Sequence, residues 1–176
     1  MEKFKRLKRT LIAQGTIIDY YQDTIETPQG RIVTWDFIKN KGAAAVVAVR
    51  DDGKILMVRQ YRNALERETL EIPAGGLANP QENTREAAAR EMEEETGYYS
   101  EDLELLLSLR TTVAFCDEKI DIYIARELKQ GQQNLDEDEF IHVEAYDLED
   151  LIAMIYDGKI QDSKTIAAIM SYKNKL

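Results

Sequence analysis

The chain has 176 residues, and its 33 acidic and 23 basic side chains give a formal net charge of −10 at pH 7. This length suffices for one domain with a full hydrophobic core. The negative charge disfavours nucleic acid or an anionic membrane as a partner, because long-range electrostatics would oppose binding. A single cysteine, Cys116, excludes an internal disulfide and suits a reducing, cytoplasmic environment.

The N-terminal segment is basic, and its only apolar run covers residues 11–13. A signal peptide needs an apolar run of about 7–15 residues, and a membrane span needs about 20. We therefore expect neither, and we expect the basic cluster at residues 3–9 to be a solvated end.

Residues 10–40 alternate apolar and polar side chains around a turn at residues 28–30, which predicts an antiparallel β-hairpin. A sheet of this size buries little by itself, so it should pack on the main domain or on a second subunit. We therefore separate an N-terminal region, residues 1–41, from a main domain, residues 42–176.

The main domain begins with a predicted hairpin of residues 43–49 and 54–61. A helix is predicted next at residues 84–95, and strands follow it at residues 103–110, 119–127 and 140–146. Two helices close the chain, with Asp147 and Ser163 as their N-caps. This order predicts an α/β fold in which helices cover both faces of a mixed sheet.

The central helix, between the N-cap Asn83 and the stop Gly97, concentrates glutamates where a helix tolerates them least. Glu91, Glu94 and Glu95 share one face, where like charges repel each other, and Glu94 and Glu95 also lie near the negative end of the helix dipole. Clustered carboxylates of this kind predict a hard divalent cation such as Mg²⁺. The alternative is a solvated acidic face.

The residues around these glutamates favour the cation. Gly76, Glu82 and the run from Arg90 to Tyr98 match every specified position of the Nudix box, so the chain resembles the Nudix hydrolases. The resemblance covers residues 42–172 and implies a Nudix-type α/β/α sandwich with a mixed sheet. Residues 1–41 resemble the extra hairpin of the ADP-ribose pyrophosphatase branch, which often builds a homodimer.

The same resemblance implies Mg²⁺ as the cofactor, with Mn²⁺ as the alternative. It implies Glu91, Glu95 and Glu94 as metal ligands, together with the carbonyl group of Gly75. Arg90 is expected to orient these glutamates rather than to touch the substrate.

A further carboxylate should act as the base, because glutamates that bind metal ions are poor bases. By composition, residues 135–139 are an ordinary acidic loop. In the ADP-ribose pyrophosphatase branch a loop at this place delivers the catalytic glutamate. The resemblance therefore implies Glu139 as base or extra metal ligand, with Glu137 in reserve and Glu94 in the catalytic set.

Residues 58–62 and 71–75 resemble the same branch. Arg62, and after it Arg59, would contact phosphate or ribose, for which the guanidinium fork is suited. The alternative is a surface arginine at a strand end. Trp35 is either a core or interface residue, or it stacks on the adenine ring.

The leading hypothesis is a cytoplasmic homodimer that hydrolyses ADP-ribose, a small-molecule nucleoside diphosphate sugar, to AMP and ribose 5-phosphate. Residues 111–118 lack the proline that relatives specific for ADP-ribose usually carry there. A pyrophosphatase for another substrate, such as GDP-mannose, is therefore an alternative. The other two are a non-catalytic ADP-ribose-binding sensor and a hydrolase of damaged nucleoside triphosphates.

Overall fold

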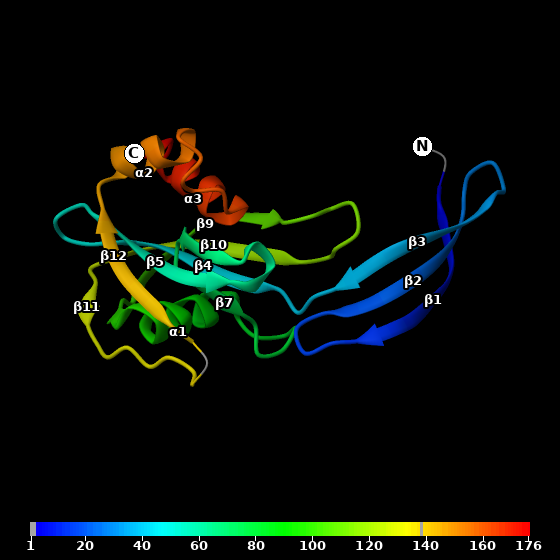
Figure 1. Cartoon of the computed structure of the whole chain (residues 1–176), viewed down its shortest axis with the longest axis horizontal. Coiled ribbons are helices and arrows are strands. Elements are labelled where there is room, and N and C mark those ends of the chain that lie inside the picture. The colour runs from blue at the N-terminus through cyan, green and yellow to red at the C-terminus, as the bar shows by residue number, and fades with distance from the viewer. Residues whose placement is uncertain (1–2, 138) are drawn as a thin grey trace. The chain divides into compact units, whose positions relative to one another are not determined.

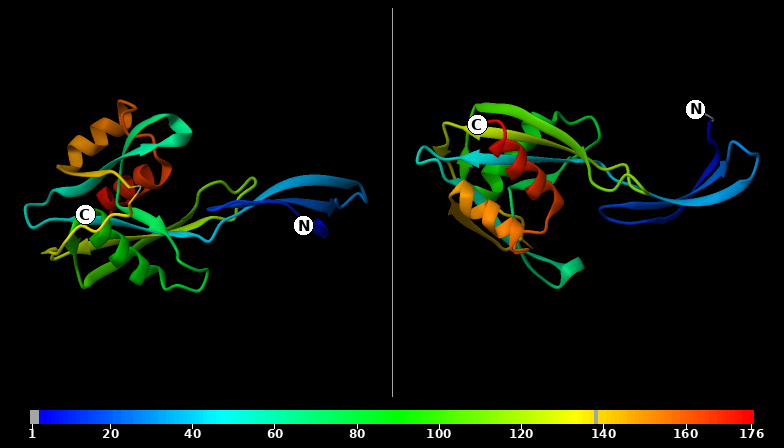
Figure 2. Two further views of the ribbon diagram at one scale, coloured as in Figure 1. Left: turned by 60° about the horizontal axis from the view of Figure 1, so that its bottom comes forward. Right: turned by 90° about the horizontal axis from the view of Figure 1, so that it is seen from above.

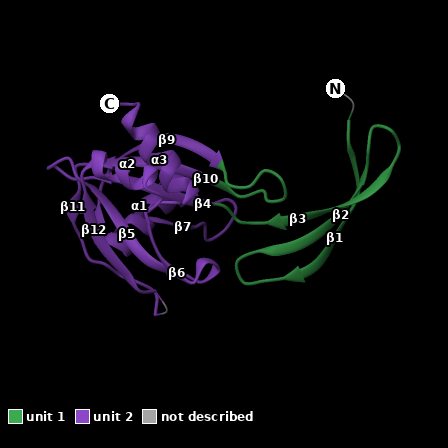
Figure 3. Ribbon diagram, turned by 45° about the horizontal axis from the view of Figure 1, so that its top comes forward, with its two compact units in different colours: residues 1–42, 110–119 green, residues 43–109, 120–176 purple. Residues whose placement is uncertain are grey.

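The structure is a computed structural model that describes residues 3–137 and 139–176. The chain forms two compact units, coloured separately in Figure 3. Unit 1 comprises Met1–Gly42 and Arg110–Lys119, and unit 2 comprises Ala43–Leu109 and Ile120–Leu176.

Unit 2 is built on a mixed seven-stranded sheet (Figure 1). Its strands are β4 (Ala43–Val49), β5 (Ile55–Arg62), β6 (Arg67–Glu71), β7 (Ala74–Gly76), β9 (Asp102–Arg110), β10 (Lys119–Arg126) and β12 (Ile141–Tyr146). The main order is β12-β5-β4-β10-β9, with β6 beside β5 and β7 beside β4. β4 and β10 run parallel in the middle, where the apolar run of β4 and the buried residues 120–125 of β10, apolar except for Asp121, suit burial on both faces.

Helices cover both faces of this sheet. α1 (Thr84–Thr96) lies on one face, and α2 (Leu148–Tyr156) and α3 (Ser163–Lys173) lie on the other (Figures 1 and 2). The cause is the alternation of side chains along β4: Val46 packs in the core with Met92 of α1, and Val47 packs with Ile169 of α3. The predicted α/β/α sandwich with a mixed sheet is confirmed.

The remaining elements of unit 2 are short. A 3₁₀ turn, Asn63–Leu65, joins β5 to β6. β8 (Tyr98–Tyr99) pairs with β11 (Lys129–Gln130) just after α1. The cap of α3 differs from the prediction, because Asp162 rather than Ser163 accepts the hydrogen bond from the Thr165 amide, at 3.0 Å.

Unit 1 contains an antiparallel three-stranded sheet in the order β1-β2-β3. The strands are β1 (Lys5–Gln14), β2 (Asp19–Glu26) and β3 (Ile32–Lys39). The turn between β2 and β3 places Gly30 at φ +78°, which favours glycine. The predicted hairpin is therefore present, with one more strand added to it.

That additional strand, β1, covers most of the segment predicted to be a solvated basic end. Lys5, Arg6 and Lys8 are exposed, in agreement with that prediction, but Arg9 is half-buried. Arg9 explains the difference, because its guanidinium forms a fork to both oxygens of Asp23 on β2, at 2.7 Å each. The same guanidinium lies 3.6 Å from the centre of the Phe37 ring. Cross-strand pairing of a charge with a partner that is distant in sequence has no local signal.

Residues 110–119 belong to unit 1 through hydrogen bonds with the end of β3. The amide of Ile38 donates to the Phe115 carbonyl at 2.7 Å, and the amide of Asn40 donates to the Asp117 carboxylate at 2.9 Å. Among the described residues, no helix is long and apolar enough to cross a membrane.

Candidate active site

A cap at each end sets the limits of α1. The side chain of Asn83 accepts a hydrogen bond from the Arg85 amide at 2.9 Å, and Gly97 ends the helix at φ +73°. Between them, residues 88, 92 and 95 follow helical spacing and form the stripe that faces the sheet. Because Glu95 continues this apolar stripe, its carboxylate is buried.

Glu95 is only 4% exposed, and its Oε2 accepts a hydrogen bond from the amide of Ala74 at 3.0 Å. Burial raises the pKa of Glu95 to about 8, against the effect of the Ala74 amide. The negative charges of Glu91 and Glu139 raise it further. A cation at this carboxylate would compensate the cost of burying its charge.

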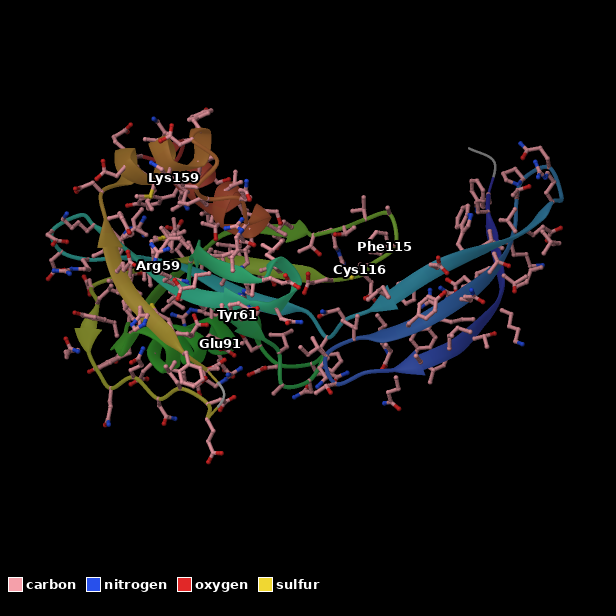
Figure 4. All side chains as sticks on the ribbon, viewed as in Figure 1. Arg59, Tyr61, Glu91, Phe115, Cys116 and Lys159 are labelled. Atoms are coloured by element: carbon pink, nitrogen blue, oxygen red, sulfur yellow. The ribbon has the colours of Figure 1, made fainter. Side chains whose placement is uncertain are left out.

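Glu91 lies one helical turn before Glu95 on α1 (Figure 4). Its carboxylate lies against the backbone of β7 at Gly75. A Cβ atom at Gly75 would lie 2.0 Å from both the Glu91 Cδ and its Oε2. Only glycine therefore leaves room for this carboxylate. Burial also raises the pKa of Glu91, and the adjacent Arg90 opposes that shift.

Arg90 links the acidic side chains of this cluster. Its Nη1 contacts Glu91 Oε1 at 2.6 Å and Glu94 Oε2 at 3.0 Å, and its Nη2 lies 3.4 Å from Glu82 Oε1. Glu82 in turn accepts a hydrogen bond from the Ala78 amide at 2.6 Å. These contacts agree with the prediction that Arg90 orients the glutamates, which stays a prediction.

The donor set fits a hard divalent cation. Carboxylate oxygens are the ligands such ions prefer, and the glycine at position 75 leaves a place for them beside the backbone. Within residues 3–137 and 139–176, no group of three or more His, Cys, Asp or Glu side chains has the geometry of a metal site. A cation that bound Glu91 and Glu94 would compete with Arg90 for the same oxygens.

The segment that leads into the acidic loop is hydrogen-bonded to the C-terminal end of α1. The side chain of Gln133 donates to the Glu95 carbonyl at 2.7 Å, and the amide of Asn134 donates to the Glu94 carbonyl at 2.9 Å. Farther along, Glu139 is exposed and accepts a hydrogen bond from the Asp136 amide at 3.3 Å. These anchors keep the loop on the same end of the helix as the glutamates.

Of the two candidate bases in this loop, Glu139 acts on the α1 glutamates. The charge of Glu139 is among the causes that raise the pKa of Glu91 and of Glu95. Glu137 is also exposed. The structure therefore brings Glu139 within electrostatic range of the cluster, and the order of preference between the two stays a prediction.

Arg62, at the end of β5, forms a fork with Glu71. Its Nε and Nη2 donate to the two carboxylate oxygens at 2.7 and 2.6 Å. The hydrogen bonds to Glu71 raise the pKa of Arg62, against the effect of burial, and the more distant charge of Glu95 adds to them. Arg62 thus lies within electrostatic range of Glu95.

Arg59 has different surroundings. Three residues apart on one strand, Arg59 and Arg62 point to opposite faces of the sheet. Arg59 pairs with Glu144 of β12 at 2.5 Å, and the Tyr146 hydroxyl donates to the same carboxylate. The structure therefore does not group Arg59 with Arg62, although a substrate contact by Arg59 stays a prediction.

Trp35 belongs to unit 1, whereas the glutamates belong to unit 2. Its side chain is 49% exposed and packs on the ring of Phe4, with 5.4 Å between ring centres. It also lines a cavity of about 600 Å³ together with Tyr20, Asp36, Ile38, Ala114 and Phe115. Trp35 is therefore not a core residue of the single chain, and the interface and base-stacking predictions for it remain.

Sequence reasoning missed one charged residue beside this site. Lys164 is buried and contacts both Glu71 and Asp162. A lysine at the start of a predicted helix has no feature that distinguishes it from a solvated one, so the sequence offered no signal.

Comparison with known proteins agrees with the fold and the motif. The sequence model of the NUDIX domain matches residues 39–169. The chain is 40% identical to the ADP-ribose pyrophosphatase of Bacillus subtilis (strain 168), over 94% of this chain and 90% of that protein. It is also 40% identical, with the same coverage, to the methanol dehydrogenase activator of Bacillus methanolicus.

Among solved structures, one described as an ADP compounds hydrolase has the same fold. It superposes with a TM-score of 0.88 at 22% identity, covering 100% of this chain and 95% of that one. The motif at residues 76–98, the sandwich around it and these matches agree, and the chain belongs to the Nudix family of hydrolases.

Proposed function

We propose that this enzyme hydrolyses the diphosphate bond of ADP-ribose, giving AMP and ribose 5-phosphate, with Mg²⁺ as its metal. The observation that carries the proposal is the carboxylate cluster of Glu91, Glu94 and Glu95 beside Gly75. Any larger residue at position 75 would collide with the Glu91 carboxylate. The substrate is taken from the ADP-ribose pyrophosphatase of Bacillus subtilis, because the similarity spans nearly the whole of both chains.

In this proposal Glu91, Glu94, Glu95 and the carbonyl group of Gly75 hold the metal. Nudix hydrolases generally need a divalent cation, which supplies charge neutralisation at the diphosphate and activation of the attacking water. Mg²⁺ is preferred for an all-oxygen donor set, and Mn²⁺ is the alternative.

The remaining residues bind the substrate and move a proton. Water attacks one phosphorus, the bridging P–O bond breaks, and Glu139 takes the proton of the water, with Glu137 in reserve. Arg62 binds a phosphate oxygen through its guanidinium, and Arg59 is the second candidate. Trp35 stacks on the adenine ring, and residues 1–41 build a homodimer in the cytoplasm.

A substrate panel tests the proposal. Purified protein would be incubated with ADP-ribose, GDP-mannose, NADH and a nucleoside triphosphate, with and without Mg²⁺, and the products would be separated. We expect Mg²⁺-dependent release of AMP, fastest from ADP-ribose. Faster turnover of another compound would make that compound the preferred substrate. Tight binding of ADP-ribose without turnover would favour a non-catalytic sensor.

The metal ligands are tested by Glu95→Gln. This change keeps the size of the side chain and its acceptor for the Ala74 amide, and it removes the charge. We expect kcat to fall by about 10²–10⁴-fold while the melting temperature changes little, because the lost interaction acts in the transition state.

Glu93→Gln is the matched control, because Glu93 lies on the same helix but is exposed. It should leave kcat within about twofold of the wild type. Unchanged turnover in Glu95→Gln, or an equal loss in both variants, would contradict the metal-site assignment.

A further inference from the structure

Lys164 is a buried cation in the second position of α3. Its side chain is only 11% exposed, and lysine is rarely buried unless it is paired. Its Nζ donates to Glu71 Oε2 and to Asp162 Oδ2, the second at 3.0 Å. Its partners are therefore one strand residue of the main sheet and the cap of its own helix.

Glu71 is the centre of this network and is 2% exposed. Its Oε1 accepts from Arg62 Nε and from the Thr69 hydroxyl, the latter at 2.6 Å. Its Oε2 accepts from Arg62 Nη2 and from Lys164. Each oxygen thus has two donors, which leaves the carboxylate one orientation.

Arg62 is the part of the network that reaches solvent, with 40% of its side chain exposed. The fork engages its Nε and Nη2, so Nη1 is the nitrogen that lies outside the fork and can donate to a ligand. Because Glu71 holds the fork, the direction of Nη1 depends on the orientation of the Glu71 carboxylate.

Lys164 also determines the net charge of the side-chain cluster to which an anionic ligand would bind. With Lys164 and Arg62 as cations, and Glu71 and Asp162 as anions, the cluster is formally neutral. Without Lys164 the same cluster would carry a negative charge, and Glu71 would neutralise Arg62 alone. A diphosphate would then be repelled where it should be bound.

We propose that Lys164 is a positioning residue for the anionic substrate, which acts through Glu71 to fix the direction and the effective charge of Arg62. The inference rests on the proposed function, because it takes Arg62 as a phosphate ligand. Lys164 itself does not touch the substrate in this proposal.

Lys164→Met tests the proposal, since methionine keeps the length and the apolar stem of lysine and removes its charge. The expected result is a KM for ADP-ribose raised about tenfold with kcat within about threefold, because the interaction concerns binding rather than the chemical step. Lys164→Arg, which keeps the positive charge, should show a KM between those of Lys164→Met and the wild type. Lys173→Met is the matched control on α3, because Lys173 is more exposed and pairs with Glu149.

A merely structural role predicts a different pattern. Lys164→Met would then lower the melting temperature and leave KM unchanged, and that result would overturn the proposal. A double variant adds a second criterion: in an Arg62→Gln background, loss of Lys164 should raise KM no further. An additive rise would show that Lys164 does not act through Arg62.

Thr69→Val keeps the proposal testable if Lys164→Met does not fold. It removes one donor from Glu71 at nearly constant volume and without a change of charge. KM should then rise about two- to threefold with kcat unchanged, and an unchanged KM would overturn the proposal.

Calorimetry with ADP in the absence of metal separates this inference from the proposed function. Lys164→Met, or Thr69→Val in its place, should weaken ADP binding relative to the wild type even if ADP-ribose is not the substrate. Failure of the wild type to hydrolyse ADP-ribose, with ADP binding still dependent on Lys164, would overturn only the proposed function. Equal ADP affinity in wild type and variant would overturn the role of Lys164.

Discussion

At the scale of single residues, Gly75 shows that an absent side chain can shape a site. The Glu91 carboxylate lies where a Cβ atom of residue 75 would be, at 2.0 Å. The neighbouring Gly76 faces open space, with no heavy atom within 4 Å of its own Cβ position. Two adjacent glycines of one strand therefore have different roles.

This contrast predicts different effects for the same substitution. Gly75→Ala should displace the Glu91 carboxylate and lower kcat with ADP-ribose by at least about 10²-fold. Gly76→Ala, the control, should keep activity within a few-fold of the wild type. Steady-state kinetics of both variants checks this, and similar activities would contradict the close approach of Glu91 to β7.

The lowered pKa of Glu71 predicts that the stability of the folded state depends on pH. Burial alone would raise its pKa, but Arg62, Lys164 and Thr69 outweigh burial and lower it from 4.5 to about 2. A depressed pKa stabilises the folded state above the unfolded value of 4.5, and this contribution is lost as pH falls from 4.5 toward 2. A shift of this size corresponds to about 3 kcal/mol.

Denaturant unfolding at a series of pH values checks this prediction. The free energy of unfolding should fall between about pH 5 and pH 2, and Glu71→Gln should flatten that fall while lowering the plateau near neutral pH. Glu149→Gln is the control, because Glu149 is exposed and its pair with Lys173 contributes little. A wild-type slope retained in Glu71→Gln would assign the effect to other carboxyl groups.

At the scale of elements, the C-terminal end of α1 is closed by the segment that leads into the acidic loop. Amides or side chains of that segment donate to the carbonyl groups of Glu94, Glu95 and Gly97. These carbonyl groups have no partner within the helix, so the segment satisfies them. The helix that carries the proposed metal ligands and the loop that carries the proposed base are therefore connected.

Gly97 lies at this junction, and its substitution tests the connection. At φ +73° an alanine is strained, and its Cβ would lie 3.0 Å from the Gln133 amide nitrogen. Gly97→Ala should lower the free energy of unfolding by about 1–2 kcal/mol and also reduce kcat. The control Gly158→Ala has the same sign of φ but its nearest neighbour, Gln161, is 3.8 Å away.

The control should lose stability and keep its activity. Chemical denaturation and steady-state kinetics on both variants separate the two effects. If both lost activity equally, the strain in the backbone alone would explain the result, and the contact with residue 133 would have no role in catalysis.

At the scale of the whole molecule, unit 1 exposes many large apolar side chains in the single chain. They are Phe4, Leu7, Leu11, Ile12, Ile17, Ile18, Ile32, Trp35, Val113 and Phe115. Exposed apolar surface of this kind is typical of an interface between proteins. It supports the proposal of a homodimer built through residues 1–41.

Sedimentation tests the homodimer. The full chain should sediment as a dimer, and Ile12→Asp should shift it to monomer, because a charge would be buried in an apolar interface. Tyr156→Asp is the control, since Tyr156 is an exposed residue of α2 in unit 2. A wild type that is monomeric at micromolar concentration would contradict the proposal.

Much of this protein follows from local sequence patterns. Asn83 and Gly97 predicted the limits of α1, and the turns at residues 30 and 53 predicted the hairpins, because capping and positive φ are local requirements. The spacing of Gly76, Glu82 and residues 90–98 identified the family, which the NUDIX match confirms. Helical periodicity also places Glu91, Glu94 and Glu95 on one face without any knowledge of tertiary contacts.

Only the tertiary structure could decide which charges meet. Arg9 of β1 pairs with Asp23 of β2, and Lys164 pairs with Glu71, which lies 93 positions away in the chain. The ion-pair partners of Arg59 and Arg62, which are Glu144 and Glu71, likewise appear only in the folded chain. The reason is physical: caps and turns depend on neighbouring residues, whereas buried charge pairs depend on which distant segments the packed sheet and helices bring together.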